Sequence, residues 1–204
     1  MKKFAFAALF AASTMVATAA MAQDTTTSFR GFRVEGNAGY DWAHSEGSHN
    51  AKFGYGGSVG FDGLVANRIV IGPEFTYWHP NDGKNTVSTN VAGGGALYHR
   101  QGDQLSGDIR VGYLVTPDFL VFGKGGYVNE QQRRLFVAPV GQTGFDSRGH
   151  ADGYQYGGGV EFTLHDKFSA VPGGLYVSAQ YVRSQFDNHT ADNHAMGGIG
   201  FRFK

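Results

Sequence analysis

The stretch HAMGGIGFRFK, residues 194–204, decides the fold of this chain. Apolar residues recur at every second position, with Ile199, Phe201 and Phe203 on one face and Arg202 on the other. A period of two is that of a β-strand, in which successive side chains point to opposite faces. The stretch therefore predicts a strand with one apolar face and one polar face, and it leaves open which face meets water.

The composition excludes several classes of protein. The 204 residues carry no net charge, include 32 glycines and no cysteine, and are 14% aromatic. A neutral chain lacks the basic footprint of nucleic-acid binding, so we expect no nucleic-acid partner. The absence of cysteine excludes disulfides, thiolate catalysis and cysteine-based zinc sites. The aromatic content is too high for a disordered chain.

The first 22 residues have the three parts of a secretory signal peptide. Lys2 and Lys3 form a positive region, residues 4–16 an apolar region, and Ala20-Met21-Ala22 a cleavage site of small residues. We expect residues 1–22 to be removed and the mature chain to lie outside the cytoplasm. After this segment no apolar run approaches the ~20 residues that a membrane helix needs.

The period of two recurs along the mature chain. In GFRVEGNAGYDW, residues 31–42, Phe32 and Tyr40 lie on one face while Arg33 and Glu35 lie on the other. Seven further segments repeat the pattern, which gives eight expected strands. They occupy residues 31–42, 53–62, 69–77, 105–115, 119–128, 154–164, 175–182 and 194–204. Within the third, Pro73 cannot donate a ladder hydrogen bond, so we expect a β-bulge there.

The two faces of these segments carry the wrong residues for a soluble sheet. The large aromatics share one face, and the charged residues share the other face with small glycines. A soluble antiparallel sheet turns its bulky apolar residues inward. A barrel in lipid has the opposite arrangement, with apolar residues outside and polar residues inside. We therefore expect an all-β, transmembrane, antiparallel up-and-down barrel.

We expect eight strands within residues 30–204, preceded by a short periplasmic segment at 23–29. Ten strands are the alternative, because GALYHRQ (95–101) and RRLFVAPV (133–140) could extend or add strands. The connections alternate between short, as at 116–118, and long, as at 79–104 and 129–153. Outer-membrane barrels have short periplasmic turns and long external loops, so both termini are expected at the periplasmic end.

The aromatic residues divide between the two ends on this topology, as expected for two interfacial girdles. Tyr113 departs from the division, and strict alternation aims Arg183 at lipid. We expect Arg183 near the outer rim, in contact with lipopolysaccharide phosphates, or displaced by a bulge. The external set is Tyr40, Trp42, Tyr55, Tyr77, Tyr127, Tyr156 and Tyr181, and the periplasmic set is Phe32, Phe61, Phe119, Phe162, Phe201 and Phe203.

The chain resembles the small OmpA-like and Opa-type outer-membrane β-barrels of Gram-negative bacteria, the porin family. The resemblance covers the whole mature chain and rests on GFRVEGNAGYDW, FLVFGKGGY, AQYV and the C-terminal strand. It implies a cell outer-membrane location, and lipid, lipopolysaccharide and the assembly machinery as partners. It also implies that Gly198, Phe201 and Phe203 form the C-terminal assembly signal. Met196 and the final Lys204 depart from the family's pattern at this signal.

The inward charges are expected to form a polar network that fills the lumen, because eight strands leave room for little except side chains. Buried charges are tolerated when they are paired. The alternative is a narrow, porin-like channel or transporter for small molecules. We expect no enzyme activity, no cofactor and no metal site. The network consists of Glu35, Glu74, Asp108, Arg110, Lys124 and Glu161.

The leading functional hypothesis is a barrel that presents external loops for envelope structure or surface binding. Loops carried on a rigid scaffold carry function disproportionately. We therefore expect any recognition of a surface ligand at 79–104 and 129–153, which combine aromatic residues with arginine and histidine. These residues are His79 with Trp78 at the root, His99, Arg100, Arg133, Arg134, Phe136, Phe145 and His150.

Overall fold

The structure is a computed structural model, and it describes residues 29–45, 48–81, 86–88, 96–138, 143–164, 174–187 and 191–203. The predicted signal peptide lies outside the described residues. No helix in the described part of the chain is long and apolar enough to span a membrane. The strands are β1 (Gly31–Ser45), β2 (Ser48–Val65), β3 (Ile69–Pro80), β4 (Thr86–Ser88), β5 (Ala96–Thr116), β6 (Phe119–Val137), β7 (Phe145–Thr163), β8 (Leu175–Phe186) and β9 (Ala191–Phe203).

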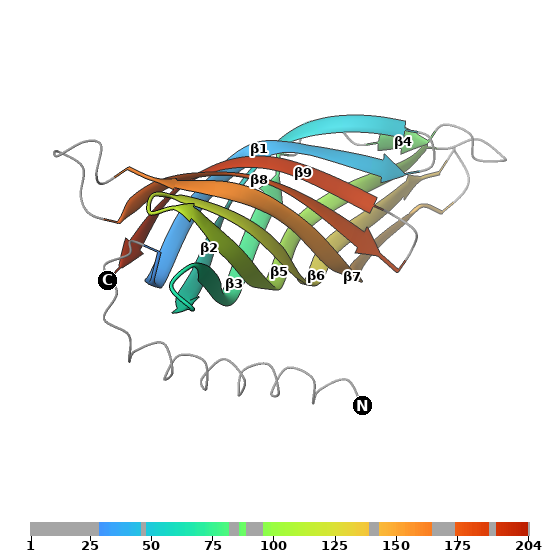
Figure 1. The fold of residues 1–204 in the computed structure, drawn as a ribbon. Helices are drawn as coiled ribbons and strands as arrows, with labels where there is room; N and C mark the ends of the chain where they lie inside the picture. Colours follow the sequence, from blue (N-terminus) through green and yellow to red (C-terminus); the bar gives the residue numbers. More distant parts are fainter. Residues whose placement is uncertain are drawn as a thin grey trace, which may run out of the picture.

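Eight of these strands form a closed antiparallel barrel (Figure 1). Neighbours along the chain pair with one another, β1 pairs with β9, and β3 pairs with β5. The three-residue β4 lies outside the ring, and within the described part of the chain it pairs with β5 alone. The predicted fold class and the count of eight are confirmed. The two stretches that could have added strands instead extend β5 and β6.

The ends of the barrel differ in their connections. At one end, β2 and β3 are joined through Ala66 and Asn67, both with positive φ, and β5 and β6 through Pro117 and Asp118. The C terminus lies at this end (Figure 1), which is the periplasmic end by the rule of short periplasmic turns. At the external end the β1–β2 connection is shorter than the predicted 43–52, because the strands continue to Ser45 and Ser48.

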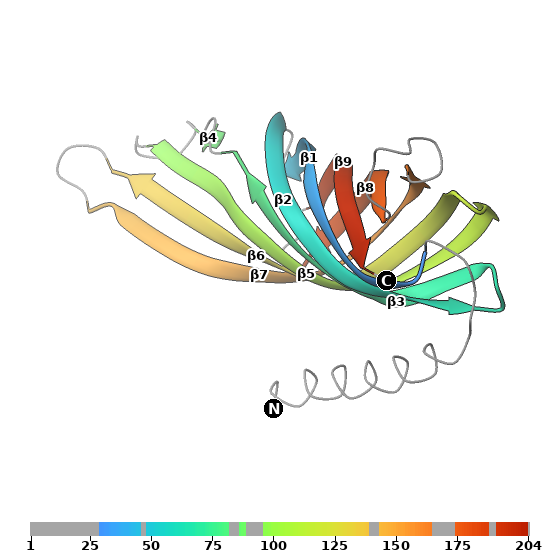
Figure 2. The same cartoon turned by 90° about the vertical axis from the view of Figure 1, so that its left-hand side faces the viewer.

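Most of the described residues within 79–104 and 129–153 are strand, which corrects the expectation of long loops there. β5, β6 and β7 contain 21, 19 and 19 residues, while about 9–11 tilted residues cross a membrane. The ladder of β6 and β7 is unbroken up to Phe136 and Phe145. Figure 2 shows this hairpin extending beyond the ends of β1, β8 and β9. Continued backbone pairing between polar residues, which hydropathy does not reveal, carries these strands past the membrane.

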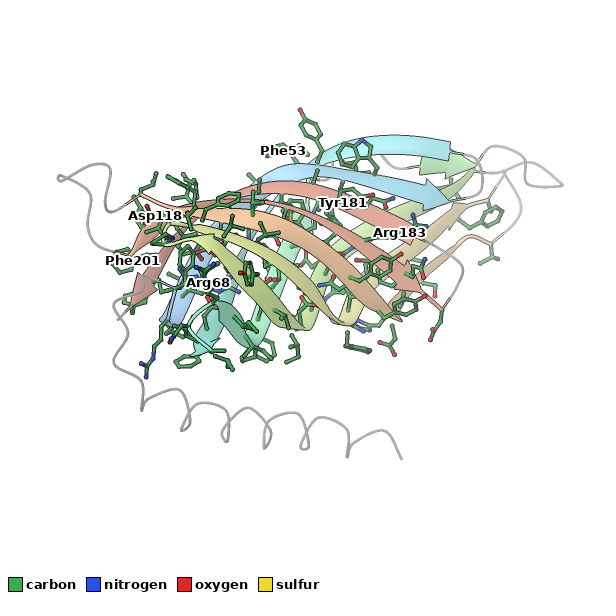
Figure 3. All side chains as sticks on the ribbon, in the orientation of Figure 1. Phe53, Arg68, Asp118, Tyr181, Arg183 and Phe201 are labelled. Carbon is green, nitrogen blue, oxygen red and sulfur yellow. The ribbon has the colours of Figure 1, made fainter. Side chains whose placement is uncertain are left out.

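The outward face carries the apolar residues, as the period of two predicts. The seven predicted external girdle residues are all exposed on this face. Phe32 and Phe203 are exposed at the periplasmic end, where Phe61, Phe119, Phe162 and Phe201 are half-buried. Figure 3 shows Phe201 and Arg68 toward one end of the barrel and Tyr181 toward the other. Tyr113 belongs to the periplasmic end, where its hydroxyl is 3.3 Å from Arg68 Nη1.

The expected bulge at Pro73 is wrong. The register of β2 against β3 is the same on both sides of this residue, from Gly60↔Glu74 to Gly63↔Ile71. Proline removes one hydrogen-bond donor, and the ladder resumes without an inserted residue. The irregularities lie instead between β5 and β6, at Gln101/Gln104 and Leu114/Thr116.

Arg183 lies on the outward face, and no bulge displaces it. The registers of β8 against both neighbours are continuous through this residue, which lies opposite Tyr156 and Asn193. It is half-buried and lies farther toward the external end than Tyr181 (Figure 3). Of the two expected placements, the outer rim is the one observed. Contact with lipopolysaccharide stays a prediction.

Replacement of Val111 by arginine tests the assignment of the lipid face. Val111 is exposed on the outward face of β5, about midway between the two girdles. Val111→Arg should lower the free energy of unfolding by about 2–4 kcal/mol, measured by denaturant titration in lipid vesicles. The matched control is Gln131→Arg on the same face beyond the external girdle, where the change should be near zero. Equal losses at the two positions would contradict the assignment.

Candidate functional site

The inward face of the barrel holds a network of buried charges around Asp62. This carboxylate on β2 lies 2.7 Å from Arg202 Nη2 on β9, 3.2 Å from Arg33 Nε on β1 and 3.4 Å from Arg110 Nη1 on β5. All four side chains are almost completely buried. Strand alternation turns each of them into the lumen. Asp62 therefore connects four strands across the interior.

Glu161 on β7 closes a second set of ion pairs with the same arginines. Its carboxylate lies 2.6 Å from Arg110 Nη2 and 2.7 Å from Arg202 Nη1. Each of these two arginines thus bridges Glu161 and Asp62. The four groups form a ring of alternating charge in the lumen, with no carboxylate facing another without a guanidinium between them.

Glu74 on β3 extends the network toward β6. Its Oε1 lies 2.7 Å from Lys124 Nζ, and its Oε2 pairs with Arg33. Thr76 Oγ1 donates a hydrogen bond to the same carboxylate at 3.3 Å. Through Glu74 and Arg33, the ammonium of Lys124 is linked to the group around Asp62.

The structure brings together four of the six predicted lumen residues, namely Glu74, Arg110, Lys124 and Glu161. The other two lie at the edge of the network. Glu35 accepts a hydrogen bond from Ser178 Oγ at 2.8 Å and lies 3.9 Å from Arg33 Nη1. Asp108 accepts bonds from Gln155 at 2.7 Å and Ser106 at 3.3 Å.

Sequence reasoning missed three members of the network: Arg33, Asp62 and Arg202. Arg33 and Arg202 stood on the polar face of their segments, and Asp62 closed the second segment. Alternation could have assigned all three to the lumen. Alternation does not show that these three residues contact one another. Their contact depends on the register between strands that are distant in sequence.

Aromatic and aliphatic side chains close the lumen on the periplasmic side of these charges. The guanidinium carbon of Arg110 lies 3.8 Å from the Phe122 ring centroid, and that of Arg202 lies 4.9 Å from Tyr176 and 5.2 Å from Phe29. Phe29 precedes β1, in the predicted periplasmic segment, and is fully buried. It belongs to an apolar cap at the periplasmic end, formed by Phe29, Leu64, Val70, Leu114, Leu120 and Phe122.

A second apolar group lies above the charges, toward the external end. Trp78, Val182 and Met196 form one buried cluster, and the ring of His194 lies 5.7 Å from that of Trp78. A cavity of about 20 Å³ for a water-sized sphere lies beside them. A space of this size holds a single water, since one water needs at least about 10–15 Å³.

The predicted assembly signal has an observed packing role at Gly198. A Cβ here would overlap the side-chain oxygens of Glu35, Ser178 and Asn37, so a larger residue would force these inward groups to shift. Phe201 and Phe203 point outward, with ring centroids 4.9 Å apart. Phe203 also lies 6.0 Å from Phe32 on β1. The role of these residues in assembly stays a prediction.

Replacement of Asp62 tests the stabilising role of the network. Asp62→Asn leaves Arg33, Arg110 and Arg202 short of a buried counter-charge, which should cost about 3–5 kcal/mol in denaturant unfolding. Asp103→Asn is the matched control, because Asp103 pairs with His79 at 2.5 Å on the partly exposed outer surface. It should cost less than about 1 kcal/mol. Similar losses in both variants would show that burial of the charges is not decisive.

Comparison with known proteins agrees with this geometry. The family "Outer membrane protein beta-barrel domain" matches residues 6–203. Two solved structures share the fold at low identity: Ail, the attachment invasion locus protein of Yersinia pestis, solved with the heparin analogue sucrose octasulfate, and Neisserial surface protein A. For Ail the TM-score is 0.55 at 14% identity, covering 85% of this chain and 99% of Ail. For Neisserial surface protein A the TM-score is 0.51 at 13% identity, and the match covers 84% of this chain and 97% of that protein. No curated protein sequence matches. The chain therefore belongs to the outer membrane protein beta-barrel family and resides in the cell outer membrane.

Proposed function

We propose that this protein is a closed outer-membrane barrel that acts through its external surface. The ion pairs of Asp62 and Glu161 across the lumen carry this proposal, because they join side chains from β1, β2, β5, β7 and β9. A solute that crossed this layer would have to separate several buried pairs. Removal of one partner from such a pair leaves an uncompensated buried charge, which is costly.

Two apolar layers support a closed lumen. The cap around Phe29 and Leu120 lies on the periplasmic side of the charges, and the cluster of Trp78, Val182 and Met196 lies on the external side. Eight-stranded barrels have interiors just wide enough for side chains. The lumen carboxylates Asp62, Glu74 and Glu161 are engaged in ion pairs, which also favours a protein without enzymatic chemistry.

The external extension of β5, β6 and β7 supports a binding role. Gln131, Asp146 and His150 are exposed on it, beyond the level of the external tyrosines. A sheet anchored in a rigid barrel holds its surface residues in place, which limits the entropy lost on binding. Among proteins of this fold, Ail was crystallised with a sulfated sugar analogue, which agrees with a binding role for such barrels.

Conductance across a planar bilayer separates this proposal from the channel alternative. The inserted wild-type protein should show no discrete ion-conducting steps, because its lumen is filled. Insertion is verified independently by the heat-dependent gel mobility of the recovered barrel. Stable steps from verified, folded protein would contradict the closed lumen and favour a narrow channel.

We further propose that residues 1–22 direct export and are cleaved, and that Phe201 and Phe203 are read by the assembly machinery. Phe203→Ser should lower the amount of assembled protein in cells more than Phe32→Ser does. The two rings are in contact and similarly exposed, at 48% and 47%, so both substitutions weaken the same girdle. Refolding into vesicles without the machinery should be affected equally. Equal losses in cells would remove the assembly role.

A further inference from the structure

One histidine is buried at the external end of the lumen. His194 on β9 is 3% exposed, and neither of its ring nitrogens has a hydrogen-bond partner among the described residues. Alternation turns the side chain inward, as it does for Asp192 and Met196 on the same strand. Buried polar groups are normally hydrogen-bonded, so this exception calls for an explanation.

The ring of His194 lies between an indole and a carboxylate. Its centroid is 5.7 Å from that of Trp78 on β3, in an edge-on arrangement. Its Nδ1 is 3.7 Å from Asp41 Oδ2 on β1, beyond hydrogen-bond distance, and Asp41 lies directly opposite His194 in the β1–β9 ladder. Asp41 is also almost completely buried, and its Oδ1 has no hydrogen bond within the described structure. A small rotation of the imidazole therefore decides whether it contacts Trp78 or Asp41.

The packing leaves room for this rotation. The cavity of about 20 Å³ described above is lined by His194 and by the external apolar cluster of Trp78, Val182 and Met196. Lys124 also lines the cavity, and its ammonium group belongs to the charged network. The cavity has room for one water, so a displaced ring would be solvated rather than forced against apolar side chains.

The charged groups at this end of the lumen favour a proton on the imidazole. Among the described residues, carboxylates outnumber ammonium groups here, which opposes the effect of burial on a charged ring. Lys52 lies directly opposite Asp41 and is half-buried, so this end of the lumen is close to external water. From β3, β7 and β8 the facing side chains are uncharged. The charged groups are Asp41 on β1, Lys52 on β2, Asp108 on β5, Lys124 and Glu130 on β6, and Asp192 on β9.

We propose that His194 is a pH-sensitive switch at the external end of the lumen. At neutral pH its uncharged ring packs against Trp78 and completes the external apolar cluster. Acidification of the external medium adds a proton to the ring, which then turns toward Asp41 and forms a buried ion pair with that carboxylate. Trp78 loses the contact, and the external apolar cluster loosens and admits water. The charged network around Asp62 stays paired, so the switch goes beyond the proposed closed barrel and can fail independently of it.

The two tryptophans of the chain allow the switch to be observed directly. Trp42 is exposed on the outward face, and Trp78 is buried in the lumen. In phospholipid nanodiscs the ¹⁵N-labelled protein gives one indole N–H signal for each, and Trp42→Phe assigns them. From about pH 8 to about pH 4 the Trp78 signal should shift along one titration curve, while the Trp42 signal stays nearly constant. A Trp78 signal that does not change with pH would overturn the proposal.

Substitutions identify the group that takes up the proton. His194→Gln and His194→Phe stay uncharged, and each should abolish the titration of the Trp78 signal. Asp41→Asn removes the counter-charge, so the titration should move to lower pH by at least about one pH unit. His79→Gln is the matched control, because His79 pairs with Asp103 on the partly exposed outer surface, and it should change nothing. Heat-dependent gel mobility verifies that each variant is folded.

Two results would contradict this assignment. A titration that persists in folded His194→Gln would assign the proton to a carboxylate and overturn the switch. A titration at the same pH in Asp41→Asn would overturn the ion pair.

Quenching of Trp78 fluorescence by acrylamide tests whether the cluster loosens. In Trp42→Phe, where Trp78 is the remaining tryptophan, the quenching constant should rise as the pH is lowered through the titration of the indole signal. In the double variant W42F/H194Q it should stay at its neutral-pH value. An equal rise in both would show that acid admits water without the histidine, which would overturn the proposal.

Discussion

The pairing of buried charges across the lumen is the constraint on which the barrel interior depends. An eight-stranded barrel has space inside for side chains alone, and charges there must meet opposite charges. Asp62 and Glu161 satisfy this condition for Arg110 and Arg202 together. Because these residues come from β2, β5, β7 and β9, their contacts link strands on different sides of the ring. A shift of one strand by a single residue would turn its charge into lipid.

The filled interior also explains why small residues lie beside the lumen charges. Gly198 lies beside Glu35 and Ser178, where a Cβ would overlap their oxygens, and Gly200 lies against the ring of Tyr176. Small residues on the inward face make room for the long side chains of their neighbours. The same alternation leaves the outward face to aromatic and aliphatic residues that contact lipid. Packing inside and solvation outside are thus two consequences of one pattern.

The outward face no longer has to be apolar where the strands leave the membrane. Beyond Tyr127 the outward face of β6 lies in water, so polar residues such as Gln131 are tolerated on it, while Val128 and Glu130 on the inward face stay buried. The backbone ladder nevertheless continues to Phe136. The membrane barrel therefore serves as a rigid base for a polar sheet.

The sequence by itself determined the barrel, its eight strands and the direction of its side chains, because a period of two is a local property that survives in the fold. It assigned Glu74 and Lys124 to the lumen for the same reason. It did not predict that Arg33, Asp62 and Arg202 meet, nor that Phe29 closes the lumen. It also took residues 96–104 and 129–137 for loop, since polar strands outside a membrane lack a hydropathic signature. Only the tertiary structure decided these points, because register and closure place residues distant in sequence at one height.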